Sequence, residues 1–273
     1  MRVLLLCDDS ANQRLLAHRL NSVLPLTEIG VISLPRTRKR PPLAPRIANV
    51  TLGLPLRRAW FAMLAECSRK APKFPDSPLT NHLGVNACSV QNRVTKIRPD
   101  LVLVSGTNLL RQPLINLIAE SGSTLNLHTG ISPFIKGGPN CTNWALSLGE
   151  FDLIGNSVMW LDSGIDSGAL VATERTPLSG LETLIELHIA VMDHAHDLYC
   201  RVVGRAAAGL ALSRVPQDTL GNGRLFLTKH WTARQIVRAV LNFKRNYGPD
   251  AFSSMRSLPL LALEQDEEAV TAA

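Results

Sequence analysis

The chain has 273 residues, of which 45% are hydrophobic and 19% are charged, a composition typical of a globular protein with a substantial core. No apolar stretch approaches the ~18 residues of a membrane-spanning helix, and the start MRVLLLCDDS lacks the long apolar region of a secretory signal. We therefore expect no membrane partner. The five scattered cysteines, without a C-x-x-C pair, predict a reduced, cytoplasmic protein without a zinc site.

The net charge of +7 is unevenly distributed along the chain. Between Arg36 and Lys73, ten Lys and Arg residues are accompanied by a single acidic residue, Glu66. Such a stretch can be a solvated segment, or a platform for an anionic small molecule or for nucleic acid. Because it holds few aromatic residues for base stacking, we favour the small molecule and select Arg38 and Arg40 as candidate substrate-binding residues.

The first elements follow a strand–helix–strand order. Val3–Cys7, VLLLC, is a continuous apolar run of strand length, residues 11–24 have apolar positions at helical spacing, and Thr27–Leu34 is a second strand. This order is typical of an α/β domain. Residues 35–80, rich in Pro and Arg, interrupt the alternation and contain one predicted helix near Leu56–Ser68, so we interpret them as an insertion or an irregular crossover and not as a separate domain.

The alternation resumes after residue 80 and predicts an α/β fold with a mostly parallel, twisted sheet and helices on both faces. Strands are predicted at residues 99–106, 123–128, 153–161 and 168–178. Helices are predicted at residues 90–97, 112–121, 140–150 and 181–204, and after Gly209 come a short strand within 221–231 and a basic helix at 232–248. We therefore expect a main domain at 1–209, a small C-terminal extension at 210–264 and a disordered tail at 265–273.

Asn126 and His128 end one of the predicted strands. Because alternate residues of a strand point to the same side, both side chains project from one face, at the end of the sheet where α/β proteins bind ligands. An amide beside an imidazole can donate hydrogen bonds to an oxygen that gains negative charge. Asp162 and Asp166 follow the next strand, and an aspartate held beside His128 would raise the pKa of the imidazole. The alternative is a structural role for the N-x-H pattern.

The segments PDLVLVSGTNLL, NLHTGISPFIKGG, WAL and GIDSGALVATERTPL together resemble the 10-formyltetrahydrofolate-dependent formyltransferases. This family includes the glycinamide ribonucleotide, methionyl-tRNA and sugar N-formyltransferases. The resemblance implies a Rossmann-like formyltransferase fold, a catalytic role for the main domain, and direct transfer of a formyl group to an amine without a covalent enzyme intermediate. Where the family more often has N-x-H-P-S, this chain has Thr129 and Gly130 in place of the Pro-Ser pair.

The resemblance also implies roles for individual residues, with 10-formyltetrahydrofolate as formyl donor and no metal. The implied catalytic residues are Asn126, His128 and Asp166. The implied folate-binding residues are Asn108, Leu109, Leu110, Asp162 and Ile165. After the first strand, Ser10 and Asn12 are candidates for binding the second substrate, and loop capping is the alternative for them.

The identity of the amine acceptor stays open at this point. We expect a small molecule with anionic groups: an amino sugar, either free or nucleotide-linked, or an amino-acid-derived amine. Glycinamide ribonucleotide formyltransferase is the main alternative. We rank the methionyl-tRNA enzyme behind it, because the residues after the long helix are too few for that enzyme's C-terminal RNA-binding domain. A formyltetrahydrofolate hydrolase and a non-catalytic nucleic-acid-binding relative also rank behind the glycinamide ribonucleotide enzyme. A homodimer is compatible with the sequence.

Overall fold

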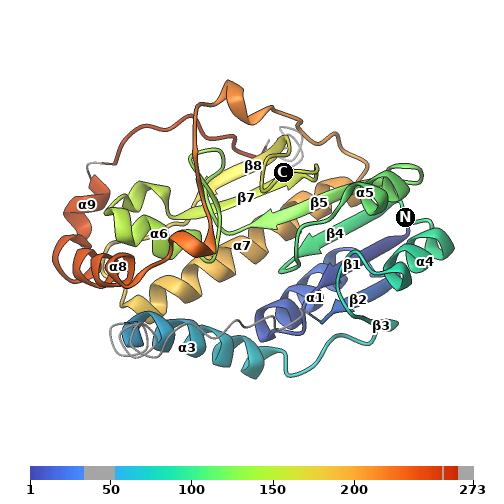
Figure 1. The fold of residues 1–273 in the computed structure, drawn as a ribbon, viewed down its shortest axis with the longest axis horizontal. Helices are drawn as coiled ribbons and strands as arrows, with labels where there is room; N and C mark the ends of the chain where they lie inside the picture. Colours follow the sequence, from blue (N-terminus) through green and yellow to red (C-terminus); the bar gives the residue numbers. More distant parts are fainter. Residues whose placement is uncertain (34–52, 254, 264–273) are drawn as a thin grey trace, which may run out of the picture.

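The structure is a computed structural model, and it describes residues 1–33, 53–253 and 255–263. In these residues seven strands form one sheet in the order β3-β2-β1-β4-β5-β7-β8, and helices cover both of its faces (Figure 1). Strands β3, β2, β1, β4 and β5 are parallel, whereas β7 is antiparallel to both of its neighbours. The predicted α/β class with a mostly parallel sheet is confirmed.

The bounds of the strands and helices agree with the prediction to within a few residues wherever an element was predicted. The strands are β1 Val3–Cys7, β2 Glu28–Ile32, β3 Leu79–His82, β4 Leu101–Ser105, β5 Ser123–His128, β6 Ile135–Gly137, β7 Gly155–Trp160, β8 Leu170–Arg175 and β9 Arg224–Phe226. The helices are α1 Ala11–Val23, α3 Leu54–Lys70, α4 Cys88–Ile97, α5 Gln112–Ala119, α6 Cys141–Leu148, α7 Leu184–Ala207, α8 Ala233–Asn246 and α9 Pro249–Ser253, with short 3-10 turns η1 Phe151–Leu153, η2 Gln217–Thr219 and η3 Thr228–His230.

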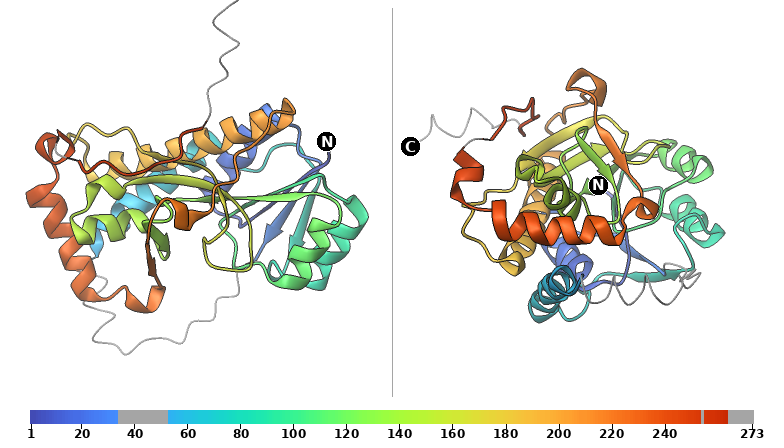
Figure 2. Two further views of the ribbon diagram at one scale, coloured as in Figure 1. Left: turned by 90° about the horizontal axis from the view of Figure 1, so that it is seen from above. Right: turned by 60° about the vertical axis from the view of Figure 1, so that its left-hand side comes forward.

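The burial of β1 on both faces of the sheet explains why its sequence is apolar without interruption. Its residues Val3, Leu5 and Cys7 belong to a core with α1 and α7, while Leu4 and Leu6 belong to a second core with α4 and α5. Figure 2 shows the same two layers from other directions, with the sheet between α1 and α7 on one side and α4 and α5 on the other. A strand buried on both faces needs apolar residues at successive positions.

The strand order places a crevice beside β1. The chain runs outward from β1 to β2 and β3, and then returns to β4 on the opposite side of β1. At such a reversal the loops after the two neighbouring strands lead away from each other, and ligands bind between them at the carboxyl ends of the strands. The loops that follow β1 and β4 begin at Asp8 and Gly106, and both residues line the cavity described below.

The stretch that was interpreted as an insertion joins the main fold in its second half. Met63 and Cys67 of α3 pack in a core with residues of α1 and α7, and β3 pairs with β2 as the edge strand of the sheet. Strand β3 was not predicted, because its sequence LTNH is polar and mostly not buried. Arg38 and Arg40 lie outside the described residues, as does the predicted tail at 265–273.

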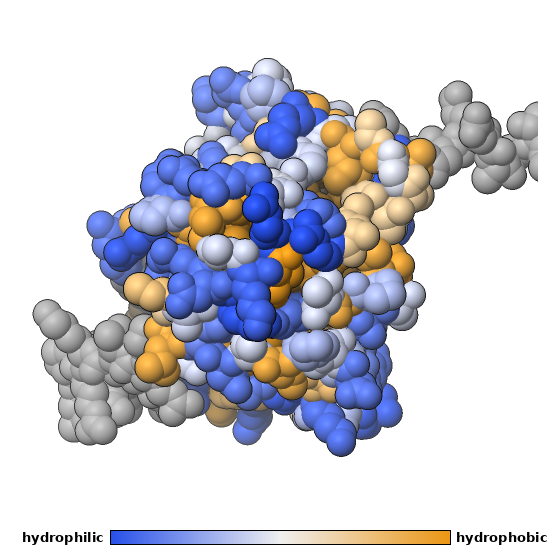
Figure 3. Space-filling model, turned by 90° about the vertical axis from the view of Figure 1, so that its right-hand side faces the viewer, coloured by the Kyte–Doolittle hydropathy of each residue, from blue (hydrophilic) through white to orange (hydrophobic). Residues whose placement is uncertain are grey.

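The residues after α7 pack back against the main domain. Strand β9 pairs in parallel with β6, and α8 packs on α6 with Ile236 and Ala239 in the shared core. Thr232 precedes α8, and its side chain makes no cap hydrogen bond. Over the part of the chain that the structure describes, no helix is long and apolar enough to cross a bilayer. Figure 3 shows one face of the molecule, on which apolar areas are separated by hydrophilic side chains.

Candidate active site

A cavity of about 740 Å³ lies at the carboxyl ends of β1, β4 and β5. Its volume is in the range of small-molecule sites, about 300–1,000 Å³. Ten of the predicted site residues belong to the described part of the chain, and all ten line this one cavity. They are Ser10, Asn12, Asn108, Leu109, Leu110, Asn126, His128, Asp162, Ile165 and Asp166.

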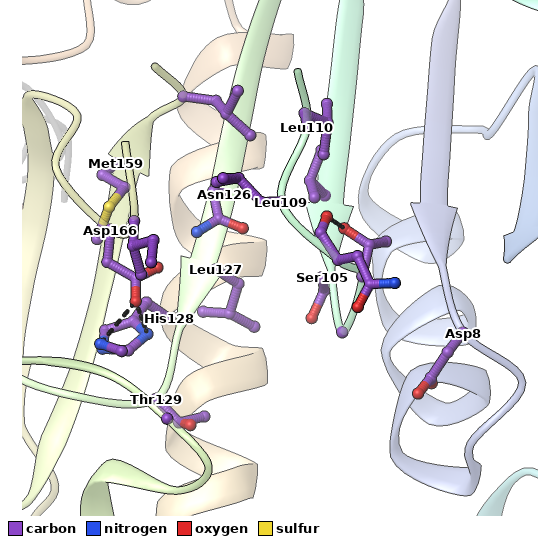
Figure 4. A pocket seen from close by; sticks show the side chains of 18 of the residues that line it. Asp8, Ser105, Leu109, Leu110, Asn126, Leu127, His128, Thr129, Met159 and Asp166 are labelled. Carbon is purple, nitrogen blue, oxygen red and sulfur yellow. Dashed lines mark hydrogen bonds and ion pairs between the residues drawn. The ribbon is translucent and has the colours of Figure 1, made fainter. Parts of the chain in front are cut away.

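His128 and Asp166 form an ion pair in the cavity wall. The Nδ1 atom of His128, at the end of β5, lies 3.3 Å from Oδ2 of Asp166, in the loop between β7 and β8 (Figure 4). The same carboxylate oxygen accepts a hydrogen bond of 2.9 Å from the backbone N–H of Gly137. The two side chains are 9% and 16% exposed, so water competes little with their interaction.

The surroundings of His128 keep its imidazole protonated. Burial alone would lower the pKa of His128, because the imidazolium ion loses its hydration. The Asp166 carboxylate, the Cys141 sulfur at 3.6 Å and the Ile135 carbonyl at 3.4 Å oppose this effect and raise the pKa to about 9. His128 is therefore a cation at neutral pH, and both of its ring nitrogens carry protons.

Asn126 stands two residues before His128 on the same face of β5. Its neighbours in the sheet are Val104 of β4 and Met159 of β7. Figure 4 shows its amide projecting into the pocket on the side of His128 and Asp166, whereas Asp8 lies across the pocket at the end of β1. The predicted amide, imidazole and carboxylate are thus brought together, although β5 supplies the first two and the loop between β7 and β8 supplies the third.

A buried hydroxyl fixes the loop that follows His128. The Oγ atom of Ser157 donates to the carbonyl of Gly130 at 2.7 Å and accepts from the N–H of Ser132 at 3.0 Å. A Cβ atom at Gly130 would lie 2.5 Å from Nε2 of His128, which is closer than real contacts allow. The glycine that replaces the family's more common serine is therefore required by the position of the imidazole in this chain.

Asp162 shapes the turn that carries Asp166. Its Oδ1 accepts hydrogen bonds from the N–H of Gly164 at 3.0 Å and from the hydroxyl of Ser167 at 2.7 Å. Asp166 itself has a φ of +48°, in the left-handed region that non-glycine residues rarely adopt. Asp162 thus closes the turn from one side and also lines the cavity.

The loop after β4 is held in place by Asn86. Its Nδ2 donates to the carbonyl of Leu109 at 2.9 Å, and its Oδ1 accepts from the N–H of Arg111 at 2.8 Å. Leu109 is 48% exposed and Ile165, across the pocket, is 40% exposed. Sequence reasoning did not select Asn86, because a single polar residue far away in the chain carries no pattern that marks it.

The candidates after β1 divide into two roles. The N–H and hydroxyl of Ser10 both donate to the Asp8 carboxylate, the loop-capping arrangement that was the alternative for this residue. Asn12 is 6% exposed, its Nδ2 lies 3.8 Å from the sulfur of Met192, and its Oδ1 has no hydrogen-bond partner within the described residues. Asn12 thus lines the cavity and keeps a buried acceptor without a partner in the described part of the chain. The described residues contain no cluster of His, Cys, Asp or Glu suited to hold a metal ion.

Comparison with known proteins identifies the family. Residues 69–203 match the family model described as formyl transferase. A methionyl-tRNA formyltransferase of Syntrophus aciditrophicus is 26% identical over 202 residues, which are 71% of this chain and 63% of that protein. The chain spans less than two thirds of the length of the first curated relatives it matches.

Two solved structures share the fold over nearly their whole length. A sugar N-formyltransferase from a Shewanella species has a TM-score of 0.52 at 15% identity, over 98% of this chain and 100% of that one. A phosphoribosylglycinamide formyltransferase from Anaplasma phagocytophilum has a TM-score of 0.53 at 14% identity, over 83% and 99%. Residues 69–203, the segment that matches the formyl transferase family model, include Asn126, His128 and Asp166.

Proposed function

We propose that this protein is an enzyme that transfers a formyl group from 10-formyltetrahydrofolate to a primary amine of a small molecule. The observation that carries the proposal is the convergence of Asn126, His128 and Asp166 on one wall of a single cavity. The segment that supplies all three residues is the one that matches the formyl transferase family.

The part of the cavity lined by the loop after β4 and by the loop between β7 and β8 suits a flat ring system such as a pterin. Leu109 and Ile165 present apolar side chains to the cavity, and Leu110 is buried at its base. The bonds from Asn86 hold the backbone of the loop in a fixed conformation, so its polar groups can pair with ring heteroatoms. A folate bound there supplies the formyl group. Asn108 and Asp162 complete the set of proposed folate-binding residues.

Asn126 and His128 act on the carbonyl oxygen of the group that is transferred. Negative charge develops on that oxygen as the amine nitrogen bonds to the carbonyl carbon, and fixed N–H donors stabilise the charge. The present contacts of His128 Nε2, at 3.4 and 3.6 Å, are longer than the ~2.7–3.2 Å of strong hydrogen bonds. A substrate oxygen can therefore replace them with little loss.

Asp166 serves the same step in two ways. Its charge keeps His128 protonated, and its carboxylate is a base close enough to take the proton that the amine loses, directly or through a water molecule. That proton then passes to the folate nitrogen that is released when the bond to the formyl carbon breaks. The proton donor His128 and the base Asp166 are thus held together by the contact between His128 Nδ1 and Asp166 Oδ2.

For the acceptor we propose a small amine with anionic groups, an amino sugar or an amino-acid-derived amine. The support is the charge of the stretch that contains Arg38 and Arg40, together with the polar side chains of Asp8 and Asn12 that line the cavity. Exchange of Arg38 and Arg40 for Gln should raise the KM for the acceptor and leave that for the folate unchanged. An unchanged acceptor KM would remove these arginines from the proposal.

The function is tested by incubating the protein with 10-formyltetrahydrofolate and a panel of amines, with mass spectrometry of the products. The panel contains free and nucleotide-linked amino sugars, amino-acid-derived amines and glycinamide ribonucleotide. We expect one class to be formylated by the wild-type protein and not by the His128→Ala variant. If the protein neither formylates any amine nor gains thermal stability from a folate analogue, the proposal is wrong.

A further inference from the structure

We propose that Gln217 is a positioning residue that holds Asp166 against His128. Gln217 belongs to η2 in the C-terminal extension, outside the segment that matches the family. Its predicted effect on turnover rests on the proposed function. Its effect on the His128–Asp166 pair does not, because that pair can be observed without any substrate.

The side-chain amide of Gln217 binds both ends of a three-residue segment. Its Nε2 donates to the carbonyl of Asp166 at 2.8 Å and to the carbonyl of Gly168 at 2.8 Å. An amide nitrogen has two protons, so this geometry uses each of them once. Gln217 is only 7% exposed, and water therefore cannot easily substitute for these bonds.

The turn needs such a restraint because of its backbone conformation. The left-handed φ of Asp166 is unfavourable for a residue with a Cβ atom and persists only where the surroundings enforce it. Gly168 is pressed so closely on β7 that a Cβ atom there would overlap the carbonyl oxygen of Trp160. Without Gln217, two buried carbonyls would lose their donor, and the turn could relax toward an ordinary conformation that moves the carboxylate.

Gln217 is itself held by the segment that precedes it. Val215 exchanges two backbone hydrogen bonds, of 2.8 and 3.0 Å, with Leu170 at the start of β8. The indole N–H of Trp160 donates to the carbonyl of Ser213 at 2.9 Å, and the Arg214 guanidinium lies 4.3 Å from the Trp160 ring centroid. The segment is thus attached on both sides of the turn that carries Asp166.

The same extension also restrains the carboxylate end of Asp166. Strand β9 pairs with β6, and the N–H of Gly138 donates to the carbonyl of Phe226 at 2.9 Å. This pairing fixes Gly137, whose N–H binds the Asp166 carboxylate. A Cβ atom at Gly137 would lie 2.0 Å from the Phe226 oxygen, so the approach is possible only for glycine. The backbone and the side chain of Asp166 are therefore both placed by residues 213–226.

The experiment compares Gln217→Met with Gln235→Met in the full chain. Gln235, on α8, accepts a hydrogen bond of 2.8 Å from Ser147 on α6, so its exchange removes a glutamine bond of the same extension far from the ion pair. NMR titration of His128 should give a pKa of about 9 in the wild type and in Gln235→Met. In Gln217→Met it should fall toward or below the ordinary value of about 6.5. With substrates, kcat of Gln217→Met should fall about 10- to 100-fold with little change in KM.

A merely structural role predicts a different result. Both variants would then unfold at similarly lowered temperatures, with the pKa of His128 and kcat unchanged, and the proposal would be wrong. If Gln217→Met does not fold, Gln217→Asn keeps the amide but is one methylene too short to reach both carbonyls, and the same titration decides. If the wild type transfers no formyl group, the titration still tests the positioning role, so failure of the proposed function is recognised separately.

Discussion

The two ends of the cavity differ in how their polar side chains are satisfied. At the β5–β7 end, His128 and Asp166 have defined partners on both sides. At the α1 end, Asn12 and Gln13 are buried, yet each keeps a side-chain oxygen without a partner within the described residues. Groups that are already aligned can act on a fixed reacting atom, whereas unpartnered groups gain their hydrogen bonds from a ligand. The comparison assigns chemistry to the first end and acceptor recognition to the second.

The largest effect is expected from His128→Ala, which removes the cation from the β5–β7 end. We expect kcat/KM to fall by about 10²–10⁴-fold, the range for loss of a positioned acid–base group. His194→Ala is the matched control, because His194 also pairs with a carboxylate, Glu174 at 3.2 Å, but does not line the cavity. Steady-state kinetics decide: equal losses in both variants would mean that the cavity pair has no special role.

Asp166→Asn should change the pH dependence of stability. The pKa of His128 is raised in the folded protein, so the protonated imidazole stabilises the folded state. This stabilisation is fully present below pH ~6.5 and is lost as pH rises through about 9. A pKa shift of this size corresponds to about 3 kcal/mol in the free energy of unfolding. We expect the unfolding free energy of the wild type, measured with urea, to decrease over this pH range by more than that of the variant. Parallel curves would show that Asp166 does not hold the proton on His128.

Gly130→Ala should act on the imidazole of His128 and on its neighbour Cys141, whose Cβ would lie 2.9 Å from the new Cβ atom. The new Cβ atom would lie 2.5 Å from Nε2 of His128 and force the ring to move, so we expect kcat to fall about tenfold with an intact fold. Gly248→Ala serves as the control, since nothing lies within 4 Å of its Cβ position. Unchanged kcat in Gly130→Ala would show that the exact position of the ring is unimportant.

The smallest effect is expected at the α1 end. Asn12→Ala should raise the KM for the acceptor about tenfold and leave the KM for the folate unchanged, because it removes a polar side chain from the α1 end of the cavity. The comparison of the two ends would fail if this variant lowered kcat as strongly as His128→Ala while acceptor binding stayed the same.

Much of the fold could be predicted because its strands are apolar on both faces. Composition alone predicts buried parallel strands for β1, VLLLC, and for β4, LVLVS. Strand β3 could not be found in this way because its residues are polar and lie at the sheet edge, and β6 is only three residues long. Periodicity needs several buried positions before it distinguishes a strand from a loop.

The residues of the candidate site likewise fall into those that a local sequence pattern predicts and those that depend on tertiary contacts. Asn126 and His128 could be placed together because their spacing matches the two-residue repeat of a strand. That Asp166, and not Asp162, pairs with His128 was anticipated only through the family resemblance, since the loop that carries both aspartates is far from His128 in the sequence. Gln217 and Asn86 gave no signal, because a buried amide that binds distant carbonyls depends on tertiary structure alone. The reason for glycine at Gly130 likewise becomes visible only beside the folded imidazole.

The most direct measurement is a crystal structure of the protein with a folate analogue whose formyl group cannot be transferred. We expect the carbonyl oxygen of this group to lie within hydrogen-bonding distance, about 2.7–3.2 Å, of both the Asn126 amide and an imidazole nitrogen of His128. An analogue bound with its carbonyl directed away from these two side chains would contradict this expectation.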